Sequence, residues 1–235
     1  GLSTKIGAFD FNLGCSGYVY GLALAKGLIG AGISRSLLLV TAETYTKFLH
    51  PKDKGNRTIF GDGSTATIIE NSKHEQIMEF VLGTDGRGAK NLIVPNGAMR
   101  VSYKQDAPEI TDESGNVRTD NNLYMNGPEI LNFTIAAVPK LVCEVLDVNN
   151  KSLDDISLVI FHQANRFILE YLRKKMKIPE SKFYINMLTV GNTVSSTIPI
   201  ALHDCLRRDL LKSGDEVLLV GFGVGYSWGG CVIRI

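Results

Sequence analysis

The sequence predicts a layered α/β fold with buried strands, and two observations predict it. Short runs of apolar and β-branched residues alternate with longer stretches of helical character. Most of these runs are continuously apolar, which is typical of strands that helices cover on both faces. With 235 residues, of which 44% are hydrophobic and 21% charged, the chain can bury a substantial core.

The predicted elements follow from these runs and from the turn-forming residues that bound them. The predicted strands are residues 6–11, 36–41, 65–69, 158–161, 183–187, 216–220 and 230–235. The predicted helices are residues 17–30, 128–146, 166–176 and 196–212. Residues 96–122 are polar and are expected to form a long surface excursion.

One order of elements occurs twice along the chain. A strand, a polar turn, a helix and a second strand surround Cys15, and the same order surrounds Asn192. This repetition favours a duplicated fold with Cys15 and Asn192 at equivalent turns. The alternative is the ordinary self-similarity of any α/β chain.

Composition argues against several classes of function. The formal net charge is +1, whereas general nucleic-acid binding needs a marked basic excess. The apolar runs are far shorter than the roughly 20 residues that span a bilayer, and residues 1–5 lack the shape of a signal peptide. The 4 cysteines form no CxxC pair, which disfavours a zinc site or a redox dithiol. We therefore expect a cytoplasmic protein with neither nucleic acid nor membrane as a partner.

Cys15 is the first candidate for chemistry. It lies in a glycine-flanked turn, residues 14–17, between a predicted strand and a predicted helix. The N–H groups and the positive dipole end of that helix are expected to lower the pKa of the thiol. A thiolate is the species that attacks a thioester carbonyl. A small buried cysteine that fills a gap between helix and sheet would fit the position equally well.

Two further polar residues lie at turns between predicted elements. His162 follows the apolar run 158–161, at the end of a strand where open α/β sheets present their ligand crevice. It could shuttle protons or cap the next helix. Asn192 precedes a predicted helix; it fits an N-cap, and its amide could also stabilise an oxyanion.

Two glycine-rich turns, residues 60–64 and 222–230, occupy matching places in the two halves. Neither matches a phosphate-binding motif, so nucleotide binding is unsupported. The backbone N–H groups of the second turn could instead form an oxyanion hole.

Taken together, these segments resemble the β-ketoacyl-ACP synthase III family, which has the thiolase fold. The resemblance extends from about residue 7 to residue 235. It rests on five motifs in the family's order, at residues 14–17, 60–63, 162–165, 191–193 and 222–229. It implies a thiolase-like duplicated fold, with layered helices and mixed five-stranded sheets. Residues 1–145 would hold the remainder of the N-terminal half, and residues 146–235 would form the C-terminal half.

The family's opening part has no counterpart in this sequence. That part is on the order of a hundred residues, so the resemblance implies an incomplete N-terminal half with exposed sheet edges and apolar surface. We expect weak or no condensing activity from these residues by themselves.

The resemblance implies a catalytic triad of Cys15, His162 and Asn192. Cys15 would take an acyl group from an acyl-CoA, most simply acetyl-CoA, and malonyl-ACP would then lose CO2. The resulting carbanion would attack the acyl-Cys15 carbonyl and give 3-oxoacyl-ACP, which initiates fatty-acid synthesis. His162 and Asn192 would stabilise the enolate, while the N–H groups of Cys15 and Val224 would form the oxyanion hole. The family usually has glycine in place of Val224. The resemblance implies no metal and no redox cofactor.

Contacts to CoA and to the acyl chain are implied at five positions: Lys54, Gly127, Leu131, Asn165 and Phe222. Lys54 stands where the family often has an arginine that stacks on adenine, and lysine is a poorer planar stacker. Leu131 stands where a phenylalanine is usual, which implies a differently shaped tunnel.

Protein partners are implied as well. Acidic ACP would dock on the basic residues Arg166, Arg173, Lys174 and Lys175, although most such runs are only solvated helix faces. Phe167 stands where the family has an arginine. The family's homodimer pairs a strand near the catalytic cysteine across the two-fold axis, and residues 6–11 match that strand.

Two other functions remain open. One is a specialised paralogue that makes or transfers an unusual acyl group. The departures from the family's usual residues at Val224, Leu131 and Lys54 favour it. The other is a non-catalytic partner that only binds ACP, and the intact triad argues against it.

Overall fold

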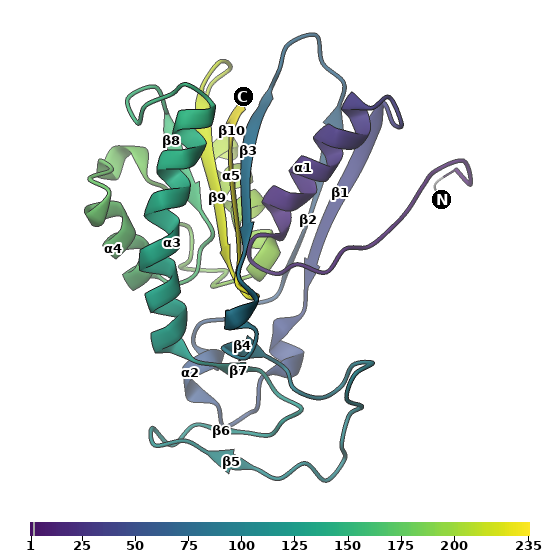
Figure 1. The fold of residues 1–235 in the computed structure, drawn as a ribbon, viewed down its shortest axis with the longest axis vertical. Helices are drawn as coiled ribbons and strands as arrows, with labels where there is room; N and C mark the ends of the chain where they lie inside the picture. Colours follow the sequence, from purple (N-terminus) through teal and green to yellow (C-terminus); the bar gives the residue numbers. More distant parts are fainter. Residues whose placement is uncertain (2) are drawn as a thin grey trace.

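The computed structural model describes residue 1 and residues 3–235. Its largest sheet has four strands in the order β3, β10, β9, β8 (Figure 1). These strands span Ile77–Thr84, Ser227–Arg234, Glu216–Gly223 and Leu158–Phe161. The pairs β3–β10 and β10–β9 are antiparallel, whereas β9 and β8 are parallel.

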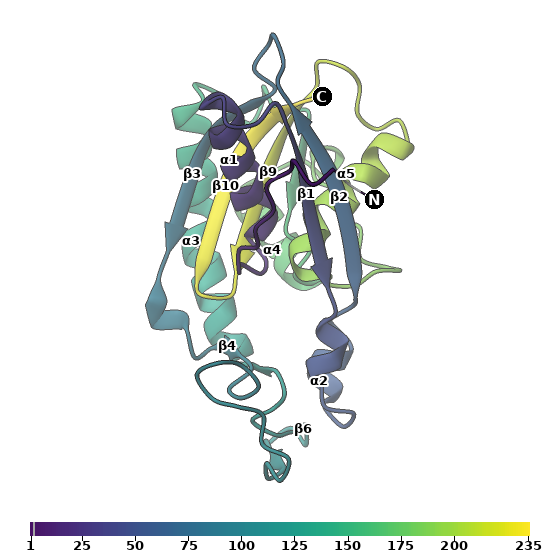
Figure 2. The same cartoon turned by 90° about the vertical axis from the view of Figure 1, so that its right-hand side faces the viewer.

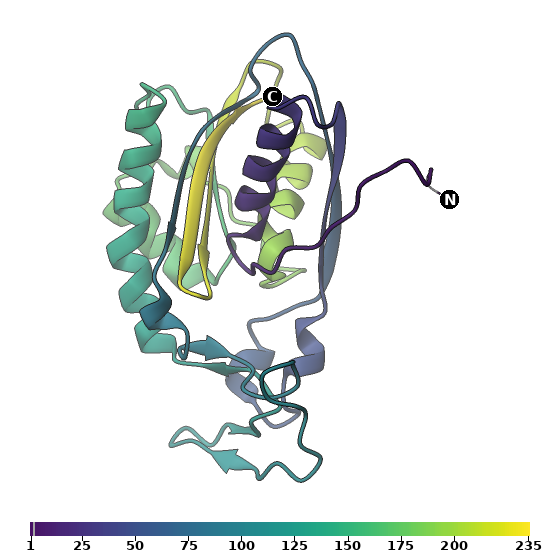
Figure 3. The same cartoon turned by 45° about the vertical axis from the view of Figure 1, so that its right-hand side comes forward.

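A second sheet pairs β1 (Ser36–Glu43) with β2 (Gly63–Glu70) in antiparallel fashion. Helices α1 (Gly17–Gly30) and α5 (Thr197–Arg207) lie between the two sheets, as Figure 3 shows. Helices α3 (Gly127–Val148) and α4 (Arg166–Lys175) cover the other face of the four-stranded sheet. The molecule therefore has the layered α/β arrangement that the sequence predicts.

The four-stranded sheet has an apolar cluster on each face, because successive side chains of a strand point to opposite sides. In β8, Leu158 and Ile160 join the cluster of α1 and α5, whereas Val159 and Phe161 join that of α3 and α4. Every residue of β9 is buried. This double burial explains why the strands appear in the sequence as continuous apolar runs.

The remaining elements are short. They are η1 (Tyr45–Phe48), α2 (Lys54–Arg57), η2 (Gly86–Gly88), β4 (Leu92–Ile93), β5 (Ile110–Thr111), β6 (Val117–Arg118), β7 (Tyr124–Met125), η3 (Glu180–Lys182) and η4 (Val194–Ser196). Strands β4 and β7 pair, as do β5 and β6. The β5–β6 hairpin lies in the predicted excursion of residues 96–122, at the lower end of Figure 1.

Two predicted strands are wrong. Residues 6–11 are assigned no strand, because no strand of the described chain pairs with them, and Phe9 is 62% exposed. Residues 183–187 contribute only an isolated parallel bridge between Phe183 and Val159. The two sheets that enclose α1 and α5 therefore have four and two strands, in place of the expected five each. Strand β3 is unpredicted, since Glu79 and Gly83 interrupt its apolar run.

Strand β3 also bears on the division of the chain. It belongs to the first predicted half, yet it pairs with β10 of the second. The division into residues 1–145 and 146–235 stays a prediction.

The outer face of the β1–β2 sheet is apolar and exposed. Leu38 and Val40 of β1 and Ile68 of β2 point outward, and Ile68 is 68% exposed. Figure 2 shows this sheet from its outer side. Among the helices of residues 1 and 3–235, none combines the length and the apolar character needed to cross a membrane.

Candidate active site

Cys15 lies in the turn that leads into α1, directly against strand β9. A Cβ atom on Gly221 would lie 2.8 Å from the Cα atom of Ser16, and one on Gly223 would lie 2.6 Å from the Sγ atom of Cys15. Glycine permits the backbone of β9 to approach the turn this closely. The two glycines thus fix Cys15 at the end of the four-stranded sheet.

A cavity of about 80 Å³ leads to Cys15. His162 and Asn192 line it together with Cys15, although the three residues come from distant parts of the chain. The complete lining is Cys15, Ile59, Phe60, Leu92, Met125, Gly127, Ile130, Thr134, His162, Ala164, Asn165, Ile168, Asn192, Phe222 and Gly223. The cavity is therefore mostly apolar, with a few polar groups gathered near the thiol, as is typical of ligand sites.

Burial raises the pKa of the Cys15 thiol to about 12. The backbone N–H of Val224 and that of Cys15 itself oppose this rise, and the nearby Glu43 carboxylate adds to it. The expectation of a lowered pKa is therefore wrong, because desolvation of the thiolate outweighs the backbone donors. Both N–H groups predicted to form the oxyanion hole nevertheless lie close enough to the thiol to favour its charged form.

His162 is buried at the end of β8, and burial lowers the pKa of its imidazole to about 3. Its Nδ1 atom lies 2.8 Å from the hydroxyl of Thr197, and that hydroxyl donates to the carbonyl of Val194 at 2.9 Å. With its only hydrogen committed, Thr197 accepts from Nδ1–H. The neutral imidazole then has Nε2 as a hydrogen-bond acceptor. The capping role is excluded, since Asn165 caps α4.

Asn192 is held by both ends of its amide. Its Oδ1 accepts from the N–H of Val194 at 2.9 Å, and its Nδ2 donates to the carbonyl of Ala164 at 3.3 Å. One Nδ2 hydrogen remains for a ligand in the cavity. The N-cap position of α5 belongs to Ser196, so the alternative role of Asn192 as the cap of that helix is wrong.

The other predicted substrate contacts divide into two groups. Gly127, Asn165 and Phe222 line the cavity. Leu131 packs against the core cluster of α3 and the sheet, so Ile130 lines the cavity in its place. Lys54 is exposed at the start of α2 and also lies outside the lining.

Two functional neighbours were not predicted. Thr197 contacts the imidazole of His162, and its signal in the sequence is only its place in the turn after Asn192. Tyr45 lies near Cys15, and burial followed by the charges of Cys15 and Glu43 raises the pKa of its phenol. Its ring contacts that of Phe60 with centroids 5.3 Å apart.

The buried His162 predicts acid sensitivity. An unfolded chain takes up this proton near pH 6.5, whereas the folded protein resists it until about pH 3. The associated stability is complete above pH 6.5 and is lost as the pH falls toward 3, at up to about 1.4 kcal/mol per pH unit. Urea unfolding of wild type and His162→Gln between pH 7 and 4 checks this. The free energy of unfolding should fall less steeply with decreasing pH in His162→Gln than in wild type. An equally steep fall in both proteins would contradict the prediction.

Comparison with known proteins identifies the family of this chain. The model of the 3-oxoacyl-[acyl-carrier-protein] synthase III family matches residues 9–86, and the model of that family's C-terminal part matches residues 146–235. The β-ketoacyl-[acyl-carrier-protein] synthase III of Clostridium tetani is 38% identical over 227 residues, which cover 97% of this chain and 68% of the relative.

Solved structures give the same result. A 3-oxoacyl-(acyl-carrier-protein) synthase III superposes with a TM-score of 0.96 at 52% identity, over 100% of this chain and 70% of that one. The priming β-ketosynthase of the R1128 polyketide pathway superposes with a TM-score of 0.83 at 28% identity, over 97% of this chain and 66% of that one. The chain thus spans about two thirds of the length of these relatives. It has the thiolase-like fold and belongs to the 3-oxoacyl-(acyl-carrier-protein) synthase III family of condensing enzymes.

Proposed function

We propose that this chain carries the acyl-transfer and condensation site of a β-ketoacyl-ACP synthase III. The observation that carries the proposal is the single cavity that Cys15, His162 and Asn192 line together. The substrates would be an acyl-CoA, most simply acetyl-CoA, and malonyl-ACP. The product would be 3-oxoacyl-ACP.

In the first half-reaction, the sulfur of Cys15 attacks the thioester carbonyl of acyl-CoA. The N–H groups of Cys15 and Val224 stabilise the negative oxygen of the tetrahedral intermediate, because both already lie at the sulfur. Nε2 of the neutral His162 can accept a hydrogen bond from the thiol, but its pKa of about 3 makes it a weak base, so we propose that the thiol proton passes to the departing CoA sulfur without a free imidazolium. The sulfur–acyl bond to Cys15 forms as the acyl bond to CoA breaks.

In the second half-reaction, malonyl-ACP loses CO2, and its carbonyl oxygen becomes an enolate. The remaining Nδ2 hydrogen of Asn192 donates to that oxygen. His162 would donate as well only after its proton moves to Nε2, which requires Thr197 to turn its hydroxyl toward Nδ1. The enolate carbon then attacks the acyl group on Cys15, and the thiol is regenerated on protonation. Each step uses side chains and backbone groups, so we propose a reaction without cofactor.

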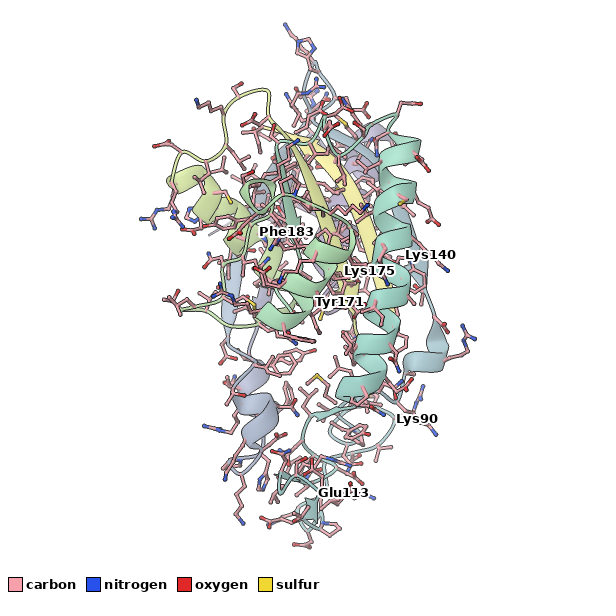
Figure 4. The ribbon with its side chains drawn as sticks, turned by 90° about the vertical axis from the view of Figure 1, so that its left-hand side faces the viewer. Lys90, Glu113, Lys140, Tyr171, Lys175 and Phe183 are labelled. Carbon is pink, nitrogen blue, oxygen red and sulfur yellow. The ribbon has the colours of Figure 1, made fainter. Side chains whose placement is uncertain are left out.

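The exposed face of α4 is proposed as the ACP docking surface. Arg166, Lys174 and Lys175 are exposed on this helix, and Arg166 directly follows the cavity-lining residue Asn165. Figure 4 shows Lys175 and Tyr171 on this helix, with Lys140 of α3 on the same face. An acidic partner would meet several cations near the entrance to Cys15.

Arg173 is excluded from this surface. Its side chain is 15% exposed, and its guanidinium binds Glu170 at 2.8 Å and the carbonyl of Ile178 at 3.4 Å. Phe167 is 70% exposed on the same helix, so apolar contact would supplement the charges.

A homodimer and a cytoplasmic location complete the proposal. The segment of residues 6–11 pairs with no strand of the described chain and exposes Ile6 and Phe9, which supports its pairing with the same segment of a second chain. The chemistry needs Cys15 as a free thiol, which a reducing compartment maintains.

A specialised acyl preference is the second candidate function, and Tyr45 favours it. Its phenol lies 3.6 Å from the position that a Cβ atom on Gly14 would occupy, beside the nucleophile. A polar aromatic side chain there would limit or select the acyl group. A structural relative is the priming β-ketosynthase of a polyketide pathway, which supports a specialised role for this fold.

The test is the conversion of malonyl-ACP, followed by mass spectrometry of the carrier protein, after priming with a panel of acyl-CoAs. These 235 residues should give weak or no 3-oxoacyl-ACP, and a longer gene product that contains them should give it readily. Cys15→Ala should give none. Malonyl-ACP that stays unchanged with both polypeptides and every acyl-CoA would overturn the proposal, and normal turnover by the 235 residues would overturn the expectation of weak activity.

A further inference from the structure

We propose that Ser16 and Ser227 are positioning residues, which act together to hold Val224 in place as an oxyanion donor. The inference rests on the proposed acyl transfer to Cys15. Both serines are buried, and their hydroxyl oxygens lie 2.6 Å apart although 211 positions separate them in the chain. Ser16 directly follows the nucleophile, and Ser227 lies three residues after Val224.

The direction of the two hydrogen bonds is fixed by counting hydrogens. The hydroxyl of Ser227 lies 3.1 Å from the carbonyl oxygen of Val224, which can only accept. Ser227 therefore donates its single hydrogen to Val224, and Ser16 donates to Ser227. A continuous chain of bonds joins the residue after the nucleophile to the carbonyl of Val224.

This chain of bonds completes the restraint on Val224. On its N-terminal side, Gly223 pairs with Ser227 in the β9–β10 ladder. On its C-terminal side, the backbone of Tyr226 exchanges two hydrogen bonds with Asp85, at 2.7 and 2.9 Å. The hydroxyl of Ser227 fixes the carbonyl of Val224 between these two anchors. Without it, the N–H of Val224 would be aimed less closely at the oxygen that becomes negative.

The side chain of Val224 makes this restraint necessary. A Cβ atom on Gly14 would lie 2.6 Å from a methyl carbon of Val224, so the valine packs directly over the nucleophile turn. Any rotation of residue 224 would move this methyl group and the N–H together. The hydrogen bond between Ser16 and Ser227 joins the turn that holds Cys15 to the turn between β9 and β10.

The test compares two reactions of the same thiol. Transfer of acetyl from p-nitrophenyl acetate to Cys15 forms an oxyanion, whereas alkylation of Cys15 by iodoacetamide forms none. Ser227→Ala should slow the acetyl transfer at saturation by about tenfold, less than the loss of a whole donor, with KM nearly unchanged. Alkylation should fall by less than about threefold, since only the weaker effect of the Val224 N–H on the thiol pKa is disturbed.

Three further variants separate positioning from simple stability. Ser16→Ala should have a smaller effect than Ser227→Ala, because the bond from Ser227 to Val224 remains. Ser227→Thr keeps the hydroxyl and should restore the transfer rate. Thr41→Val, which removes a buried hydroxyl bonded to Thr65 and Ser196, should reduce thermal stability without changing the ratio of the two reactions.

Equal loss of acetyl transfer and alkylation in Ser227→Ala, or no rescue by threonine, would overturn the inference. Because p-nitrophenyl acetate contains no CoA, the experiment distinguishes failure of the inference from failure of the proposed function. If wild type reacts with p-nitrophenyl acetate but not with any acyl-CoA, the proposed function fails while the positioning inference is still tested.

Discussion

Replacement of Asn192 by alanine, in the longer polypeptide used to test condensation, should lower the decarboxylation of malonyl-ACP by about 10²–10³-fold, the usual effect of losing one donor to a developing oxyanion. The free Nδ2 hydrogen of Asn192 is the donor that the structure makes available in the cavity. Acylation of Cys15 should change little, since its oxyanion is assigned to backbone N–H groups.

Asn192→Asp is the matched control for this prediction. It keeps the Oδ1 atom that accepts from the N–H of Val194, but it replaces the Nδ2 donor with an oxygen and so also loses the bond to the carbonyl of Ala164. Both variants should therefore lose decarboxylation, as measured by release of CO2 from malonyl-ACP. Decarboxylation that survives in Asn192→Asp, or acylation that falls equally with it, would contradict the assigned role.

Replacement of Gly221 by alanine should destabilise the protein by about 3 kcal/mol, the upper range for overpacking a core. The new Cβ atom would meet the Cα atom of Ser16 at 2.8 Å and the carbonyl oxygen of Cys15 at 3.0 Å. These are backbone atoms, so the nucleophile turn must move away from β9. We therefore expect loss of acyl transfer along with the loss of stability.

Gly27→Ala supplies the contrast within the same protein. Gly27 lies in α1, and a Cβ atom there meets nothing within 4 Å. Its replacement should stabilise the fold by about 0.5–1 kcal/mol through helix propensity. Urea unfolding of both variants measures the two free energies. Equal stability of Gly221→Ala and wild type would show that the turn does not depend on this close approach.

The fold class was largely predictable because strands β8 and β9 are buried on both faces. Double burial leaves a continuous apolar run, and 158–161 and 216–220 were recognised by it. Residues 6–11 carry a similar pattern but have no neighbouring strand to pair with in the described chain. Strand β3 is the converse case. Its local pattern is weak, and it forms a strand because β10 pairs with it.

The candidate site was predictable as far as it depends on motifs. Cys15, His162 and Asn192 were named from the sequence, and the fold brings all three to one cavity. The pKa of Cys15 could not be predicted, because its sign depends on how much water the folded chain excludes from the thiol. The bond between Ser16 and Ser227 is likewise a property of tertiary contact, with no local signal in either segment.

The central claim is that Cys15 accepts an acyl group from a CoA thioester. Incubation with acetyl-CoA, followed by intact-protein and peptide mass spectrometry, tests it most directly. The account predicts the added mass of one acetyl group on the peptide that contains Cys15, and no addition in Cys15→Ala. Acetylation of Cys143, Cys205 or Cys231 with equal yield, or an unmodified Cys15 at saturating acetyl-CoA, would contradict the account.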